Sequence, residues 1–342
     1  MNFDFTDDQQ AIKQTAKEFL ADRFPRERVR ELAESGSYDD AAWREMCELG
    51  WAGIFIEERH GGQGLGVIEL VILMEELGYA LAPVPFLSTA AAGLVIQAAG
   101  SEEQKQRWLP GIAAGEVRAT GGMLSGDEAK LVPDAGEADV IALCGSEGVH
   151  VAEPSAAEVT PISTMDATRR YARVRTDGAR EVLEGEPGPG IGAALVAVSA
   201  ELTGVAQRAM EMAVEYARER KQFGRQIGAY QAVSHRCAQM LLEVECARSA
   251  AYYAAWTADA EPTSLELAAC MAKAYASDAG WRVTASSLQV HGGIGFTWEH
   301  DLHFFLKRAK VDGMLYGSAG LLRDRVAELA GLEAGQPAPA PA

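Results

Sequence analysis

The sequence is short of positive charge. Its 342 residues include 31 Lys and Arg against 49 Asp and Glu, so the formal net charge is −18. A chain this acidic repels nucleic-acid phosphates and anionic membrane surfaces, which argues against binding to either. An anionic cofactor can still bind, provided that the few basic residues are concentrated at one place.

Cysteines and targeting signals are also sparse. The five cysteines are scattered, odd in number and without a CxxC pair, which favours reduced thiols over a disulfide framework. The first residues, MNFDFTDDQQ, contain no basic segment followed by an apolar one, so we expect no signal peptide. The longest apolar run, residues 191–206, contains Glu201 and is too short to cross a bilayer. We therefore expect a cytoplasmic protein that does not bind membranes.

Helical patterns fill the first third of the chain. Thr6 and Gln9 have the spacing of a capping box, and they open an amphipathic stretch that ends before Pro25. Further helices are predicted at 40–49, 67–81 and 101–109, separated by Gly- and Pro-containing segments. Residues 1–115 are thus predicted to form an N-terminal helical domain.

The sequence changes character over residues 116–186. Four short β-branched runs, 140–143, 149–151, 159–162 and 171–174, alternate there with Gly, Pro and Asp. This pattern is typical of short strands, and it predicts a small, reduced middle β-domain.

The helical period returns over residues 187–332. Long helices are predicted at 191–220, 229–259, 263–290 and 314–330, and their short connections favour a four-helix bundle. The Pro- and Ala-rich tail, 333–342, is expected to be disordered. The predicted fold class is mainly α with a small β-domain, in the order helical domain, β-domain, bundle.

This order of domains resembles the acyl-CoA dehydrogenase family, and three motifs agree. WREMCELGWAGIFIEERHGGQGLGVIELVILMEELGYALAP (43–83) resembles the family's N-terminal domain, RERKQFGRQIGAYQAV (218–233) its flavin pyrophosphate segment, and VHGGIGFTWEHDLHFFLKRAK (290–310) its adenine-side loop. The resemblance implies FAD-dependent α,β-dehydrogenation of an acyl-CoA. It also implies a homo- or hetero-oligomer, a dimer or tetramer, that passes electrons to electron-transfer flavoprotein or a similar acceptor.

Basic residues gather in the pyrophosphate motif. Arg218, Arg220, Lys221 and Arg225 lie within eight positions, and guanidinium groups suit phosphate oxygens. A basic helix end that complements the helix dipole is the alternative. By resemblance, the cofactor-binding residues are Arg220, Gln222, Phe223, Gln231, Gln289, His291, Gly292 and Gly293.

Adjacent glycines let the backbone approach a ligand closely, although Gly292 and Gly293 also suit a turn after a helix. Nearby, Glu299, His300 and His303 are too few and too close in sequence to indicate a metal site, and none is predicted.

The catalytic carboxylate is absent from both positions at which the resemblance implies it. Tyr316 stands where most members carry a Glu just before a Gly, and Ala194 stands at the position used by a smaller group. Glu201, seven residues after Ala194, is the only charged residue between positions 186 and 208, and it projects from nearly the same helix face. A lone buried carboxylate is costly, so Glu201 is either the catalytic base or a structural acid paired with Arg208 or a neighbouring helix. We predict the base.

The family's TEPxxGSD-like loop and WIT-like triplet, which bind the flavin ring and the thioester, are missing from residues 115–143. A displaced base would suit a bulky or branched acyl group, and in this the chain resembles actinobacterial steroid side-chain dehydrogenases, some of which are heterotetramers. Two hypotheses follow: a dehydrogenase subunit that uses Glu201, or a non-catalytic partner that completes the flavin site of a full-length sister chain. A scaffold of the same family with neither role is the remaining alternative. Apolar stretches at 268–279 and 314–322 predict an oligomer.

Overall fold

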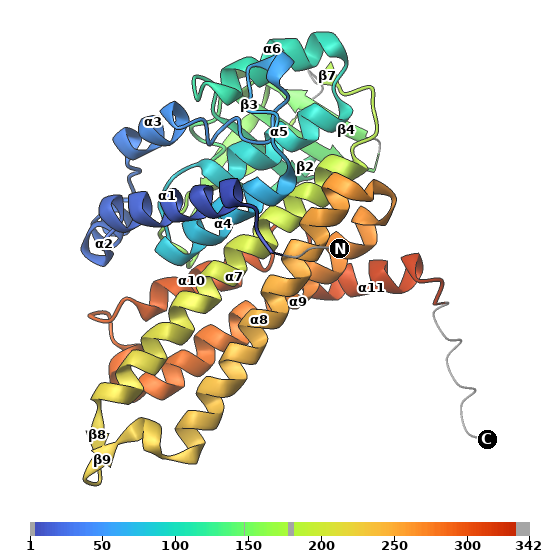
Figure 1. The fold of residues 1–342 in the computed structure, drawn as a ribbon. Helices are drawn as coiled ribbons and strands as arrows, with labels where there is room; N and C mark the ends of the chain where they lie inside the picture. The colour runs from blue at the N-terminus through green and yellow to red at the C-terminus, as the bar shows by residue number, and fades with distance from the viewer. Residues whose placement is uncertain (1–3, 147, 177–180, 333–342) are drawn as a thin grey trace, which may run out of the picture.

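The computed structural model describes residues 4–146, 148–176 and 181–332, so the predicted disordered tail lies outside the described residues (Figure 1). The N-terminal helices are α1 (Asp7–Arg23), α2 (Arg26–Ser35), α3 (Asp40–Glu48), α4 (Val67–Ala80), α5 (Phe86–Ala99) and α6 (Glu102–Ala113), with a short 3-10 helix η1 (Glu58–His60). The predicted capping box is present: the Thr6 side chain accepts from the Gln9 backbone N–H, and the Gln9 side chain accepts from the Thr6 N–H.

Helix α5 was missed by the sequence analysis. Apolar and small residues surround its whole circumference, and nearly all of them are buried. A helix buried on every side has no polar face, so the amphipathic period that reveals surface helices is absent.

Two small sheets form the middle of the chain. One has the order β1-β3-β4-β7, from β1 (Ala119–Met123), β3 (Val140–Gly145), β4 (Gly148–Ala152) and β7 (Glu181–Val182). The other has the order β2-β6-β5, from β2 (Glu128–Pro133), β5 (Glu158–Ile162) and β6 (Tyr171–Arg175), with the 3-10 helix η2 (Pro154–Ala156) before β5. Ile141 and Leu143 of the first sheet share one apolar cluster with Val132 and Val174 of the second. The four predicted runs are strands β3 to β6, whereas β1, β2 and β7 were missed.

Three long helices form the centre of the C-terminal part: α7 (Gly188–Glu219), α8 (Gln231–Ala260) and α9 (Leu265–His291). They confirm the first three long helices of the prediction. Helix α7 is long and apolar enough to suggest a membrane span by composition, but 89% of its apolar window is buried inside the protein. It is therefore the core helix of this fold.

The predicted fourth long helix, 314–330, is confirmed only in its second part, where α11 (Ala319–Leu329) lies. Residues 314–318 form a turn instead, and before this turn lies α10 (Leu302–Asp312), which was not predicted. In that turn Tyr316 has a φ of 56° and Gly317 a φ of 129°, and neither value can continue a right-handed helix. The break directs α11 away from the bundle axis, as Figure 1 shows.

Helices α4 and α7 cross backbone to backbone. A Cβ atom on Gly204 of α7 would lie 1.9 Å from the Glu75 carbonyl oxygen, and one on Gly78 of α4 would lie 2.1 Å from that of Glu201. Only glycine fits at either position. This close crossing fixes the segment of α7 that carries Glu201 in the interior.

The apolar stretch 268–279 does not form the exposed patch that was expected. Its residues pack within α9 against the rest of the bundle, and Met271, 52% exposed, is the large apolar side chain that reaches the surface. The other stretch exposes Met314 and Leu321. Of the two stretches, the second therefore exposes more apolar surface, and it does so around the α10–α11 turn.

Candidate functional site

The predicted pyrophosphate segment forms a hairpin at the far end of the bundle (Figure 1). Strands β8 (Lys221–Gln222) and β9 (Arg225–Gln226) follow α7 directly, and the 3-10 helix η3 (Ile227–Ala229) leads into α8. Phe223 and Gly224 make the turn with φ values of 52° and 82°, and the Phe223 side chain is 94% exposed. The Tyr230 hydroxyl donates to the Gln222 carbonyl at 3.1 Å, which ties the start of α8 to the hairpin.

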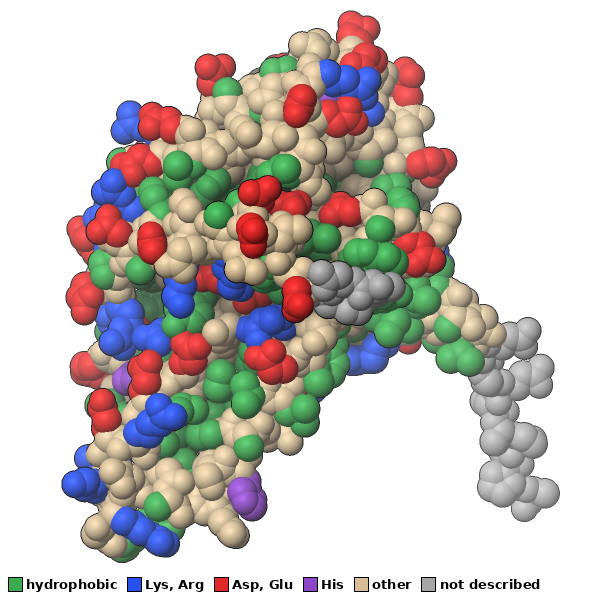
Figure 2. Space-filling view, in the orientation of Figure 1, with side chains coloured by type: hydrophobic (Ala, Val, Ile, Leu, Met, Phe, Trp, Pro, Cys, Tyr) green, Lys and Arg blue, Asp and Glu red, His purple; other side chains and the backbone are tan. Residues whose placement is uncertain are grey.

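The cations of this hairpin are available to a ligand. Arg218, Arg220, Lys221 and Arg225 are exposed, and none of them forms a salt bridge with another described residue. Figure 2 shows Lys and Arg side chains at this end of the bundle, whereas acidic side chains are frequent over the N-terminal helices. Of the four cations, only Arg218 lies in the last turn of α7. The alternative that these residues complement the helix dipole therefore explains only Arg218.

The second predicted segment lies at the same end of the bundle. Gln289 and His291 belong to the last turn of α9, and Gly292 and Gly293 open the 3-10 helix η5 (Gly292–Phe296). The His291 ring stacks on Tyr216 with centroids 4.7 Å apart, and Tyr216 lies in the last turn of α7, just before the hairpin.

The backbone of the second segment is open to a ligand. Gly292 has a φ of 62°, and an added Cβ on Gly292 or Gly293 would meet no atom within 4 Å. The structure therefore brings the GGIG segment and the basic hairpin to one end of the bundle, with Gln231 exposed at the start of α8.

The residues present fit the phosphate side of FAD. Unpaired cations and an open glycine backbone are the groups that a pyrophosphate needs, and they lie at one end of the bundle. FAD, when bound, supplies the hydride acceptor of an acyl-CoA dehydrogenation. The family's flavin-ring loop is missing from residues 115–143. The assignment of FAD contacts stays a prediction for all eight residues: Arg220, Gln222, Phe223, Gln231, Gln289, His291, Gly292 and Gly293.

Glu201 lies in the interior, 2% exposed, and two arginines hold it. Its Oε1 accepts from Arg169 Nη2 at 2.7 Å and from Arg308 Nη1 at 2.7 Å. The proposed pairing with Arg208 is wrong, because Arg208 forms its salt bridges with Glu211 and Glu215. Seven residues of helix carry Arg208 about 10 Å beyond Glu201, toward the solvent-exposed part of α7.

The two arginines extend this contact into a buried ion cluster of Asp166, Arg169, Glu201, Arg308 and Asp312. Arg308 Nε donates to Asp166 Oδ2 at 2.7 Å, and Arg169 Nη1 donates to Asp312 Oδ1 at 2.9 Å. Burial, reinforced by the Glu201 charge, raises the pKa of Asp312 to about 8. With Asp312 protonated, two guanidinium groups face two carboxylates, so the cluster is close to neutral.

The buried ion cluster joins three parts of the chain. Asp166 and Arg169 come from the segment between β5 and β6, Glu201 from α7, and Arg308 and Asp312 from α10. A carboxylate oxygen held by two guanidinium groups has no lone pair aimed at a substrate. The contacts therefore favour the structural alternative for Glu201, and its role as the base remains a prediction.

The two sequence positions without the expected carboxylate meet in the structure. Ala194 of α7 and Tyr316 of the α10–α11 turn line one small cavity of about 20 Å³, together with Gly121 and Gly122 of β1. None of the described residues that line it is acidic or basic. Nothing in the lining of this cavity can remove a proton from carbon.

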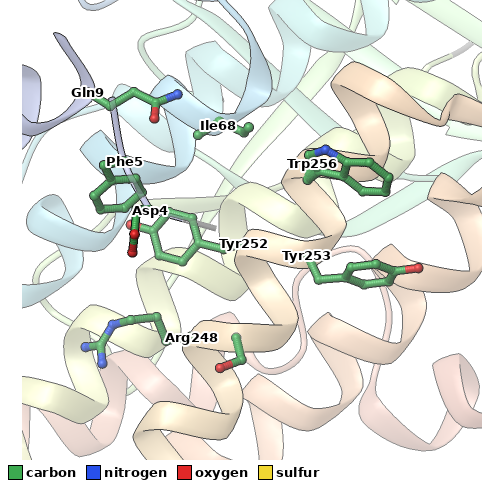
Figure 3. Close-up of a pocket in the computed structure, with 9 residues that line it drawn as sticks. Asp4, Phe5, Gln9, Ile68, Arg248, Tyr252, Tyr253 and Trp256 are labelled. Atoms are coloured by element: carbon green, nitrogen blue, oxygen red, sulfur yellow. The ribbon is translucent and has the colours of Figure 1, made fainter. Parts of the chain in front are cut away.

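Within the described residues, no group of three or more His, Cys, Asp or Glu could hold a metal ion. A cavity of about 620 Å³ between the N-terminal segment and α8 is lined by Phe5, Tyr252, Tyr253 and Trp256 (Figure 3). Its cation, Arg248, donates to Glu75 at 3.2 Å, and no predicted site residue is among the described residues that line it.

Sequence reasoning missed four members of the buried ion cluster. Arg308 and Asp312 have the i, i+4 spacing of a surface ion pair on α10, so their sequence pattern suggests solvent exposure. Asp166 and Arg169 lie in a loop with no motif. The one signal was Glu201 itself, because a lone acid in an apolar helix requires a buried partner.

Comparison with known proteins identifies the family. Residues 6–116 match the acyl-CoA dehydrogenase N-terminal domain, and residues 193–330 match the acyl-CoA dehydrogenase C-terminal domain. The acyl-CoA dehydrogenase IpdE2 of Mycobacterium tuberculosis is 34% identical over 319 residues, which cover 92% of this chain and 93% of that protein. The chain belongs to the acyl-CoA dehydrogenase family, whose members are flavin-dependent oxidoreductases.

Solved structures agree with the predicted fold class. The ChsE4-ChsE5 complex from Mycobacterium tuberculosis matches with a TM-score of 0.87 and 26% identity, covering 98% of this chain and 100% of the matched chain. The Tcur3481-Tcur3483 steroid ACAD matches with a TM-score of 0.86 and 26% identity, covering 95% of this chain and 98% of the matched chain. The predicted family and fold class are confirmed.

Proposed function

We propose that this chain is one subunit of a heteromeric, FAD-dependent acyl-CoA dehydrogenase of the cytoplasm, and that a partner subunit supplies the catalytic base. The observation that carries the proposal is the small cavity at which Ala194 and Tyr316 meet without a carboxylate. Removal of an α-proton needs a carboxylate within hydrogen-bond reach of that carbon. A chain without one at this place depends on another subunit for the chemical step.

The contribution of this chain is the phosphate side of a flavin site. The exposed cations of the β8–β9 hairpin and the open backbone of Gly292 and Gly293 supply it. Phe223, Phe296 and Trp298 are exposed beside them, and exposed aromatic side chains of this kind are common at subunit contacts. The flavin ring and the thioester then lie against a sister chain that retains the ring-side loop.

A bulky acyl-CoA, such as a steroid-derived one, is the proposed substrate class. The similarity to a protein described as a steroid ACAD supports it, and the match to a complex of two differently named chains supports a heteromer. Electrons would pass to electron-transfer flavoprotein or a similar acceptor, as the family implies.

The test is a visible absorbance spectrum of the purified chain, alone and co-expressed with a longer homologous chain encoded beside it. We expect little bound flavin in the chain alone, and in the co-purified assembly a flavin spectrum that an acyl-CoA bleaches. Tight flavin binding by the chain alone, together with bleaching by acyl-CoA, would contradict the proposal.

A second candidate keeps the base within this chain. Glu201 Oε2 is buried and has no hydrogen-bond partner among the described residues, unlike Oε1. In this alternative Oε2 accepts the α-proton, and the subunit is itself catalytic. The Glu201→Gln variant described in the Discussion separates the two candidates.

A further inference from the structure

Two cavities share Tyr316 in their linings. The inner one, of about 20 Å³, is also lined by Gly121 and Gly122. The other, of about 400 Å³, opens between the start of α7 and α11. Apolar side chains such as Leu195 and Leu322 form most of its lining, which also includes the charged residues Glu266, Asp324, Arg325 and Glu328. Met123, Ile191 and Tyr316 line both, so they form the wall between the two spaces.

Tyr316 is held in this wall at a cost. Its φ of 56° is a left-handed value that a non-glycine residue rarely adopts. Its hydroxyl is buried and has no hydrogen-bond partner among the described residues. Neither feature stabilises the fold. Glycine would adopt the left-handed backbone more easily, and phenylalanine would fill the same apolar space without a buried hydroxyl.

The space behind the ring suits an apolar chain. Gly121, Gly122, Ala91 and Ala194 line the inner cavity with little more than backbone and methyl groups. Small residues at one spot leave room that a larger group can occupy, and here the Tyr316 ring occupies it. Without the ring, the outer apolar cavity would continue to the β1 backbone.

We infer that the Tyr316 ring closes an acyl pocket in this chain, so that the partner subunit alone binds the acyl-CoA. The inference rests on the proposed function, because it explains which subunit of the assembly takes the substrate. Tyr316 is in this sense a specificity-determining residue that acts by occupying space.

The test compares variants of the full-length chain that keep or remove the ring. Tyr316→Phe keeps the ring, whereas Tyr316→Gly and Tyr316→Asn remove it and tolerate the left-handed backbone. Circular dichroism checks that each variant is folded. Binding of octanoyl-CoA is measured by isothermal titration calorimetry, with coenzyme A as the control for contacts made by the nucleotide part.

We expect the parent chain and Tyr316→Phe to bind octanoyl-CoA no more tightly than coenzyme A. Tyr316→Gly or Tyr316→Asn should bind octanoyl-CoA at least about tenfold more tightly than the parent, as burial of an alkyl chain produces. In the co-purified assembly, the same variants should raise the amount of octanoyl-CoA bound.

Equal, tight binding by the parent and the ring-free variants would overturn the inference, and so would folded ring-free variants that gain no affinity. Both readouts are independent of flavin content. A failure here is therefore distinguishable from a failure of the proposed function, which the flavin spectrum tests.

Discussion

The buried ion cluster and the β8–β9 hairpin both contain several arginines, but the arginines are buried and paired in the first and exposed and without a described acidic partner in the second. In the buried ion cluster Arg169 and Arg308 are at most 3% exposed at the side chain, and each contacts two acidic side chains. At the hairpin Arg220, Lys221 and Arg225 are exposed, and no described acid pairs with them. Arginine thus stabilises the fold in the buried ion cluster, whereas at the hairpin it remains available to a ligand.

The difference teaches how to interpret charge in this chain. A buried guanidinium requires partners because desolvation of an unpaired charge is costly, so the ion cluster is a structural unit whose members depend on one another. An exposed guanidinium without a partner pays no such cost and keeps its donors for a phosphate. Changes in the first region should therefore alter stability, and changes in the second should alter flavin binding.

The largest effect is expected for Arg308→Ala. The change leaves Asp166 and Glu201 buried without their shared cation, and removing one partner of a buried ion pair costs about 3–5 kcal/mol. Urea denaturation should show that loss in the free energy of unfolding. Arg325→Ala, which breaks an exposed pair with Glu266, is the matched control and should leave the denaturation midpoint nearly unchanged. Equal midpoints for the two variants would contradict the structural role of the ion cluster.

Glu201→Gln should have a smaller effect of the same kind. The side chain keeps its shape and one acceptor, but two guanidinium groups lose a charged partner, so we expect a loss of about 2–3 kcal/mol in the free energy of unfolding. Flavin reduction by acyl-CoA in the co-purified assembly should remain near the parent rate. A fall of 2 or more orders of magnitude, about the scale of general-base removal, would instead identify Glu201 as the base.

Arg220→Ala should change flavin binding and spare the fold. Loss of a charge-assisted hydrogen bond to phosphate should weaken FAD binding by the assembly about 10- to 100-fold. The denaturation midpoint should stay at the parent value, because the residue is exposed and unpaired. Arg44→Ala on α3 is the control for loss of one exposed cation away from the hairpin. Flavin retention equal to that of the control would show that the hairpin does not hold the pyrophosphate.

The last prediction concerns pH. The pKa of Asp312 is raised from its ordinary value to about 8 in the folded chain, so the folded state holds a proton that the unfolded state has lost between about pH 4 and 8. This contribution to stability is complete below pH 4 and disappears as the pH rises to 8, with a slope of at most about 1.4 kcal/mol per pH unit. Burial lowers the pKa of Lys273 to about 8, so that amine stays mostly charged over this window.

Asp312→Asn removes the titrating group, so the variant should lack this loss of stability. Relative to the parent, its free energy of unfolding should therefore rise between pH 5 and pH 8. Urea denaturation at several pH values measures it. A difference that is constant with pH would show that Asp312 is ionised in the folded chain throughout this range.

Local chemistry made several elements predictable. The capping box at Thr6 and Gln9 depends only on residues that are neighbours in sequence. The three long helices were predictable because their apolar residues repeat with the helical period. The basic hairpin was visible because its four cations lie within eight positions of a motif that resembles the family's pyrophosphate segment. Each of these features depends on residues close together along the chain.

Tertiary structure alone decided the rest. Helix α5 shows no polar face because neighbours cover every side, and the predicted last helix breaks where packing holds Tyr316 in a left-handed conformation. Glu201 finds its partners 32 and 107 positions away, in Arg169 and Arg308. A sequence pattern reports that a carboxylate is buried, but which distant cation faces it depends on how separate segments pack. For that reason the sequence determined that Glu201 needs a partner, and only the fold decided which one.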